Sequence, residues 1–166
     1  GYGRKYRDSL KNNWGVTDVI DACSGVDYLV TQGLVDKDKI AIRGSSAGGY
    51  TVLAALTFTG KFCAGASLYG IGDLEALAKD THKFEAHYLD SLVGNYPQEQ
   101  TIYRARSPIN HISQLNCPVI FLQGLQDKVV PPAQAEAMVA ALNKKGIYTE
   151  YVTFPEEGHG FRQAHN

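Results

Sequence analysis

Apolar residues recur every three to four positions near the start of the chain, which is the spacing of one face of an α-helix. The recurrence predicts an amphipathic helix for which Thr17 or Asp18 is available as N-cap and which Gly33 ends. The residues predicted to form its apolar face are Val19, Ala22, Cys23, Val26, Leu29 and Val30.

The rest of the chain alternates short and long apolar runs. The short runs predict strands at 39–43, 64–69, 118–122 and 148–154. Longer runs predict helices at 50–56 and 131–142, the second with proline in its first turn. Strands separated by helices connect through right-handed crossovers, so this order favours an α/β fold: a mostly parallel sheet with helices on both faces.

Residues 71–107 form a polar stretch that is longer than a plain connection between two elements. We predict a helical insert near a functional site. Its aromatic residues fit a small satellite core as well as a substrate wall, and they are Phe84, Tyr88, Tyr96 and Tyr103.

Composition narrows the class of protein. The 166 residues include 16 Lys and Arg and 17 Asp and Glu, for a formal net charge of −1, which excludes a strongly basic nucleic-acid-binding protein. No apolar run approaches the roughly 18 residues that span a bilayer, so we expect no membrane partner. The three cysteines, Cys23, Cys63 and Cys117, are far apart and favour free thiols in a reducing, cytoplasmic setting over disulfides or a zinc site.

The strongest chemical signal is Gly-Ser-Ser-Ala-Gly at residues 44–48, a G-x-S-x-G pattern between a predicted strand and a predicted helix. It makes Ser46 the candidate nucleophile. The turn is so sharp that side chains at Gly44 and Gly48 are expected to collide with their surroundings. The helix that follows points its free N–H groups at the developing oxyanion, and the N–H of Ala47 is the natural first donor.

A serine nucleophile needs a general base that a carboxylate orients. Asp127 follows the third predicted strand and is the candidate acid, while His159 lies between two glycines after the fourth and is the candidate base. The order Ser, Asp, His is that of α/β-hydrolases. No metal or cofactor is implied.

Other residues could fill these roles by type, but their placement is less favourable. Ser45, beside the candidate nucleophile, is expected to point away from the turn. The alternative acids are Asp73, Asp80, Asp90, Glu156 and Glu157, and the alternative bases are His82, His87, His111 and His165.

Four segments together resemble the catalytic domain of the prolyl oligopeptidase family, most closely its acylaminoacyl-peptidase-like branch. They are Gly-Ser-Ser-Ala-Gly-Gly-Tyr at 44–50, Ser-Pro at 107–108, the Gly-x-x-Asp-x-x-Val-Pro loop at 124–131 and Glu-Gly-His-Gly-Phe at 157–161. The likeness covers essentially the whole chain. It implies a serine peptidase of short peptides with an α/β-hydrolase fold.

The resemblance also implies roles for individual residues. Ser46 is then the nucleophile, Asp127 the orienting acid, His159 the base and Ala47 an oxyanion donor. Val130 and the loop around Ile71 border the pocket for the residue before the scissile bond. One position departs from the acylaminoacyl peptidases, which usually carry Arg between this Asp and Val-Pro; here Lys128 and Val129 stand there, which leaves the exact specificity open.

We expect the chain to be part of a longer protein. Residue 1 is glycine, and the only methionine is Met138. The resemblance implies that a β-propeller, the first strands of the hydrolase sheet and a tyrosine that is the second oxyanion donor precede it. Residues 1–166 would then be the C-terminal half of the catalytic domain, with its upstream chain as a partner and little activity when isolated. A carboxylesterase and a non-catalytic binding module are the alternative functions.

Overall fold

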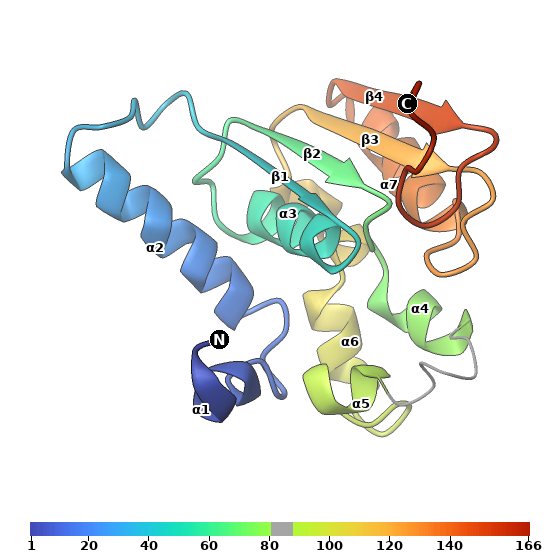
Figure 1. The fold of residues 1–166 in the computed structure, drawn as a ribbon, viewed down its shortest axis with the longest axis horizontal. Helices are drawn as coiled ribbons and strands as arrows, with labels where there is room; N and C mark the ends of the chain where they lie inside the picture. The colour runs from blue at the N-terminus through green and yellow to red at the C-terminus, as the bar shows by residue number, and fades with distance from the viewer. Residues whose placement is uncertain (81–87) are drawn as a thin grey trace.

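The computed structural model describes residues 1–80 and 88–166. Its four parallel strands form one sheet in the order β1-β2-β3-β4 (Figure 1). The strands are β1 (Ala41–Ser45), β2 (Ala64–Leu68), β3 (Val119–Gly124) and β4 (Thr149–Phe154). The α-helices are α1 (Gly3–Asp8), α2 (Thr17–Thr31), α3 (Ala47–Phe58), α4 (Leu74–Asp80), α5 (Tyr88–Leu92), α6 (Gln100–Arg106) and α7 (Ala133–Lys145), and η1 (Pro108–Gln114) is a 3-10 helix.

The predicted α/β class and the parallel sheet are confirmed, but the described residues supply helices for one face only. Each strand is followed by its neighbour in the sheet, so right-handed crossovers place all the connecting helices on the same side. The helix η1 packs against both α3 and α7, and these contacts join the helices of this side. Half-buried side chains such as Ile120 and Leu122 alternate with buried Phe121, as expected for strands with a less covered second face.

The structure corrects the N-cap residue predicted for the first long helix, α2. Its cap position is Val16, and no side chain caps it. Asp18 lies inside the helix, where its carboxylate accepts hydrogen bonds from the Gly15 N–H at 2.7 Å and from the hydroxyl of Thr51. Asp18 therefore ties α2 to α3 and to the turn before α2.

Within its described residues, the insert at 71–107 contains the helices α4, α5 and α6, and its other described residues form neither helix nor strand. A buried carboxylate, Glu75 of α4, accepts a hydrogen bond from the Arg104 side chain of α6 at 2.9 Å and further bonds from Tyr96, Gln100 and Lys79. Arg104 is the main reason that the pKa of Glu75 falls from 4.5 to about 2. This charged contact joins the two helices.

The described aromatic residues of the insert differ in their surroundings. Tyr103 is fully buried, donates a hydrogen bond to the Gly94 carbonyl at 2.6 Å and packs edge-on against Tyr96. Tyr103 is part of the main hydrophobic core and Tyr96 packs against that core, so the two do not form a separate satellite core. Tyr88 instead lines a cavity that also borders Ser46. Phe84, together with His82 and His87, lies outside the described residues.

Candidate active site

Ser46 occupies a strained turn between the end of β1 and the start of α3. Its φ of 54° and ψ of −120° lie outside the regions that non-glycine residues normally adopt, a strain that proteins tolerate mainly at functional sites. Its N–H donates to the Leu68 carbonyl at 2.9 Å, which fastens the turn to β2. The hydroxyl is thus presented at the carboxyl edge of the sheet.

The glycines around this turn differ in importance. A Cβ on Gly44 would lie 2.4 Å from the Gly48 carbonyl oxygen, so a side chain at Gly44 does collide with the backbone. A Cβ on Gly48 would meet no atom within 4 Å, and the expectation for Gly48 was wrong. The second close approach is at Gly49, whose Cβ would lie 2.7 Å from the Cα of Gly70. The crowded positions are therefore Gly44, against the backbone of Gly48, and Gly49, against the segment that follows β2.

The structure brings Ser46, Asp127 and His159 into one chain of hydrogen bonds. His159 Nε2 lies 2.8 Å from Ser46 Oγ, and His159 Nδ1 lies 2.8 Å from Asp127 Oδ2. An ionised carboxylate only accepts, so Nδ1 carries the proton and Nε2 is free to accept from the hydroxyl. This tautomer is the one that a general base for Ser46 requires.

Asp127 is held by its own loop. The second carboxylate oxygen, Oδ1, accepts hydrogen bonds at 2.9 Å from the N–H groups of both Val129 and Val130. The side chain is inaccessible to solvent, whereas the His159 side chain is 24% exposed. The Asp127 carboxylate is therefore fixed and shielded from water, whereas part of the His159 ring is accessible to solvent.

His159 is also supported by aromatic rings. The Tyr69 ring packs edge-on against the imidazole with centroids 4.9 Å apart, and Phe161 packs against Tyr69 at 5.2 Å. Tyr69 directly follows β2 and has a positive φ of 37°, a second strained residue beside the site. Sequence reasoning missed Tyr69, and its position at a strand end was the only available signal.

The described alternative acids and bases lie elsewhere. Asp73 Oδ1 accepts from the N–H groups of Glu75 and Ala76 at the start of α4. His111 packs edge-on against Phe58, with ring centroids 5.2 Å apart, and His165 is exposed near the end of the chain. None of the three enters the hydrogen-bond chain of Ser46.

Ala47 is the first residue of α3, so its N–H has no acceptor within the helix. It lines a cavity of about 250 Å³ together with Ser46 and His159. The other lining residues are mostly apolar: Trp14, Ile71, Leu77, Tyr88, Val129 and Val130. Ile71 and Val130 thus lie beside Ser46, as the resemblance implied.

Trp14, Leu77 and Tyr88 were not predicted as cavity residues. Trp14 precedes α2, is 3% exposed and packs on Tyr50 with ring centroids 4.4 Å apart. Gly15 allows this contact, since a Cβ there would lie 2.0 Å from the Tyr50 hydroxyl oxygen. A tryptophan directly before a glycine was the only signal in the sequence.

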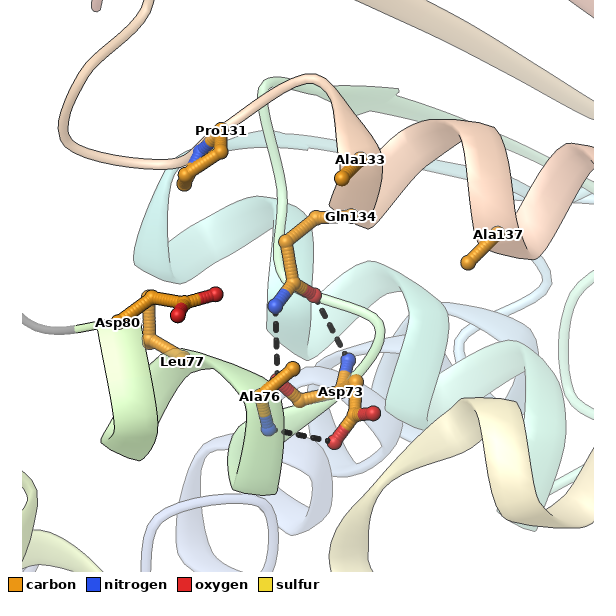
Figure 2. Close-up of a pocket in the computed structure, with 8 residues that line it drawn as sticks. All are labelled: Asp73, Ala76, Leu77, Asp80, Pro131, Ala133, Gln134 and Ala137. Atoms are coloured by element: carbon orange, nitrogen blue, oxygen red, sulfur yellow. Dashed lines mark hydrogen bonds between the residues drawn. The ribbon is translucent and has the colours of Figure 1, made fainter.

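The loop that carries Ile71 is fixed to α7 by Gln134 (Figure 2). The Gln134 side-chain oxygen accepts from the N–H groups of Gly72 at 3.0 Å and Asp73 at 2.9 Å, and its amide donates to the Asp73 carbonyl at 2.9 Å. Three hydrogen bonds from both polar groups of one buried side chain therefore hold this wall of the cavity. A smaller pocket beside it, between α4 and the start of α7, includes Asp80.

Within the described ranges 1–80 and 88–166, no group of three or more His, Cys, Asp or Glu residues is arranged to hold a metal ion. In the same ranges no helix is long and apolar enough to cross a membrane.

A serine on a strand-to-helix turn, with a histidine and an aspartate after later strands of a parallel sheet, defines an α/β-hydrolase. The model of the prolyl oligopeptidase family matches residues 1–166. The chain belongs to that family, and the resemblance noted in the sequence is confirmed.

Individual proteins agree with this assignment. The chain is 31% identical to dipeptidyl aminopeptidase BIII of Pseudoxanthomonas mexicana, covering 100% of the chain and 25% of that protein. It is 31% identical to the acylamino-acid-releasing enzyme of Arabidopsis thaliana, covering 96% and 22% respectively. The structure of a Mycobacterium tuberculosis puromycin-hydrolyzing peptidase matches with a TM-score of 0.97 and 48% identity over 99% of the chain and 25% of that protein. The chain thus spans about a quarter of the length of these relatives.

Proposed function

We propose that the complete protein is a serine peptidase in which Ser46 is the nucleophile, His159 the general base and Asp127 the residue that orients it. The observation that carries this proposal is the pair of 2.8 Å contacts that join the three side chains at a strained turn. The matched relatives, among them a dipeptidyl aminopeptidase and a puromycin-hydrolyzing peptidase, support an amide bond as the target.

The proposed reaction proceeds through an acyl-enzyme. Ser46 Oγ attacks the scissile carbonyl carbon while His159 Nε2 takes the hydroxyl proton, and Asp127 stabilises the imidazolium. The Ala47 N–H donates to the oxyanion of the tetrahedral intermediate. His159 then gives the proton to the leaving amine, and an acyl group remains on Ser46. Water, activated by the same histidine, releases the acid and restores the hydroxyl.

The cavity beside Ser46 supports a preference for short peptides with an apolar residue before the scissile bond. Ile71 and Val130 are buried, Trp14 adds an aromatic wall, and no charged side chain lines this space within the described residues. We assign Ile71 and Val130 to substrate binding on this basis. The reaction needs no metal or cofactor.

An esterase is the second candidate, because the chain is also 30% identical to the esterase LipQ of Mycobacterium tuberculosis over 96% of its length. The same triad hydrolyses esters, and the two functions differ in kcat/KM for matched substrates. Matched peptide and ester substrates with one acyl group, assayed on the complete protein, separate them.

We propose further that residues 1–166 are part of a longer catalytic domain. The short fraction of each relative that the chain covers supports this, as does β1, which within the described residues pairs on its β2 side only. An upstream strand and a second oxyanion donor would then come from the same protein. Free Cys23, Cys63 and Cys117 support a reducing, cytoplasmic location.

Labelling with a fluorophosphonate probe tests the nucleophile. In the complete protein the probe is expected to modify Ser46, and Ser46→Ala should abolish both labelling and peptide hydrolysis. The matched control is Ser45→Ala, one residue away at the end of β1, which should label normally. Labelling that survives Ser46→Ala, or a folded wild-type protein that reacts nowhere, would contradict the proposed function.

A further inference from the structure

The loop that carries His159 has little regular structure to hold it. Residues 155–166, all of which the structure describes, contain no helix or strand. Glu157 lies two residues before His159, and only 2% of it is exposed. A buried carboxylate is costly unless hydrogen bonds compensate it, so its partners show what it does.

The Glu157 carboxylate closes the loop around His159. Its Oε2 accepts from the Arg162 N–H at 3.0 Å, and its Oε1 accepts from the Gln163 N–H at 2.9 Å and from the Asn166 side-chain amide at 2.9 Å. These donors lie five, six and nine residues further along the chain. In the sequence, His159 thus lies between Glu157 and the three donors that the Glu157 carboxylate binds.

The backbone of Glu157 joins the same loop to the acid. Its carbonyl accepts from the Gln126 N–H at 2.9 Å, directly before Asp127, and its N–H donates to Phe154 at the end of β4 at 3.2 Å. A Cβ on Gly124 would lie 2.4 Å from the Glu157 carbonyl, which shows how closely the two loops approach. One residue therefore links β4, the acid loop and the base loop.

Hydrogen bonds to the charged form keep this carboxylate ionised. The Asn166 amide and the two backbone N–H groups hold the pKa of Glu157 below its usual value, against the opposite effect of burial. Charge-assisted bonds of this kind are about twice as strong as neutral ones.

We propose that Glu157 is a positioning residue for the base: its carboxylate fixes the loop so that His159 Nε2 stays at hydrogen-bond distance from Ser46. The inference rests on the proposed function. Glu157 touches neither the nucleophile nor the cavity in the contacts described, so it acts through His159 and not on the substrate. A misplacement of about 1 Å at such a base can cost about 10²-fold in rate.

The test uses the complete protein with Glu157→Gln, and with Glu156→Gln as the matched control, because Glu156 is the adjacent, exposed carboxylate. Glu157→Gln should lower kcat about 10- to 100-fold, leave KM within about twofold and slow fluorophosphonate labelling of Ser46 in parallel. Glu156→Gln should leave all three unchanged. A kcat for Glu157→Gln equal to that of the control would overturn the proposal.

A double mutant separates positioning from a general structural role. If Glu157 acts through His159, Glu157→Gln should cause no further loss of kcat in a His159→Ala background. A second loss of the same size would show that the carboxylate acts elsewhere and would overturn the inference. Full activity of His159→Ala alone would instead contradict the proposed function.

Should Glu157→Gln not fold, Asn166→Ala decides the matter. It removes one of the three donors and leaves the two backbone bonds, so we expect kcat to fall about threefold with KM unchanged. An unchanged kcat for that variant would overturn the proposal.

Discussion

The turn that bears Ser46 and the loop that bears His159 are held by different means. Ser46 is fixed by the backbone. A strand precedes it, a helix follows it, and the Gly48 carbonyl lies so close to Gly44 that no Cβ fits there. His159 is fixed by side chains, with the Glu157 carboxylate across the loop and the Tyr69 ring against the imidazole. The first region should therefore be sensitive to added volume, and the second to lost charge and lost hydrogen bonds.

The largest expected effect is that of Asp127→Asn, which changes a side chain in contact with His159 and leaves the turn of Ser46 intact. An asparagine amide cannot hold the Nδ1–H tautomer, so kcat should fall about 10⁴-fold while the protein stays folded. Peptide hydrolysis and circular dichroism of the complete protein measure the two quantities. Asp36→Asn, an exposed aspartate that bonds the Asp38 N–H in a surface turn, is the control and should change neither.

The second largest effect is expected at the turn that bears Ser46, where Gly44→Ala and Gly48→Ala form a matched pair. Gly44→Ala places a Cβ 2.4 Å from a helix carbonyl that cannot move independently, so it should cost about 3 kcal/mol of stability and about 10²-fold in kcat. Gly48→Ala enters open space in a helix and should be neutral or stabilise by up to about 1 kcal/mol. Chemical denaturation and kinetics of both variants provide the measurement. Equal stability and equal kcat of the two variants would contradict the idea that the turn of Ser46 is sensitive to added volume.

Gly124→Ala sharpens the comparison, because its Cβ would also lie 2.4 Å from a carbonyl, that of Glu157. This carbonyl belongs to a loop without helix or strand, so we expect the loop to shift and to carry His159 away from Ser46. We expect a modest stability cost of about 1 kcal/mol with a loss of about 10-fold in kcat. The ratio of the loss in log kcat to the loss in stability should thus exceed that of Gly44→Ala. The reverse order would show that the loop of His159 is the more rigid region.

The turn of Ser46 and the loop of His159 also differ in how much of each the sequence could predict. The turn of Ser46 is local, so a five-residue pattern between a strand and a helix was enough to place it. The prediction for Gly48 was wrong because the sequence does not show which glycine faces a neighbouring backbone: Gly49 lies against Gly70, and a Cβ on Gly48 would meet no atom within 4 Å. The sequence also does not give the order of the strands within the sheet, from which the position of the crossovers follows.

The contacts that hold the loop of His159 could not be predicted from the sequence, for a physical reason. Glu157 could be named only as an alternative acid, since its hydrogen bonds depend on a loop path that no periodicity describes. Trp14, which precedes α2, and Leu77 of α4 are far apart in the sequence but line one cavity. Contacts between distant segments arise from packing, and a single sequence shows little of them.

The smallest effect is in the pH dependence of stability. The folded-state pKa of Glu157 is lowered, so its contribution is fully present above the ordinary value of 4.5 and is lost as the pH falls toward the lowered value. The difference in unfolding free energy between wild type and Glu157→Gln should be constant above pH 4.5 and shrink below it. Urea titrations between pH 3 and pH 7 measure this difference. A difference that stays flat to pH 3 would mean that the carboxylate charge contributes nothing to the loop.

Ser46 and His159 are 113 positions apart in the sequence, which has a consequence for the newly made protein. A ribosome releases the chain from its N-terminus, so the serine emerges first and the histidine follows only after β4. Before β4 has paired with β3, the Ser46 hydroxyl lacks the histidine that we propose as its base. We therefore expect the proposed peptidase activity to arise late in synthesis, after this part of the sheet has formed.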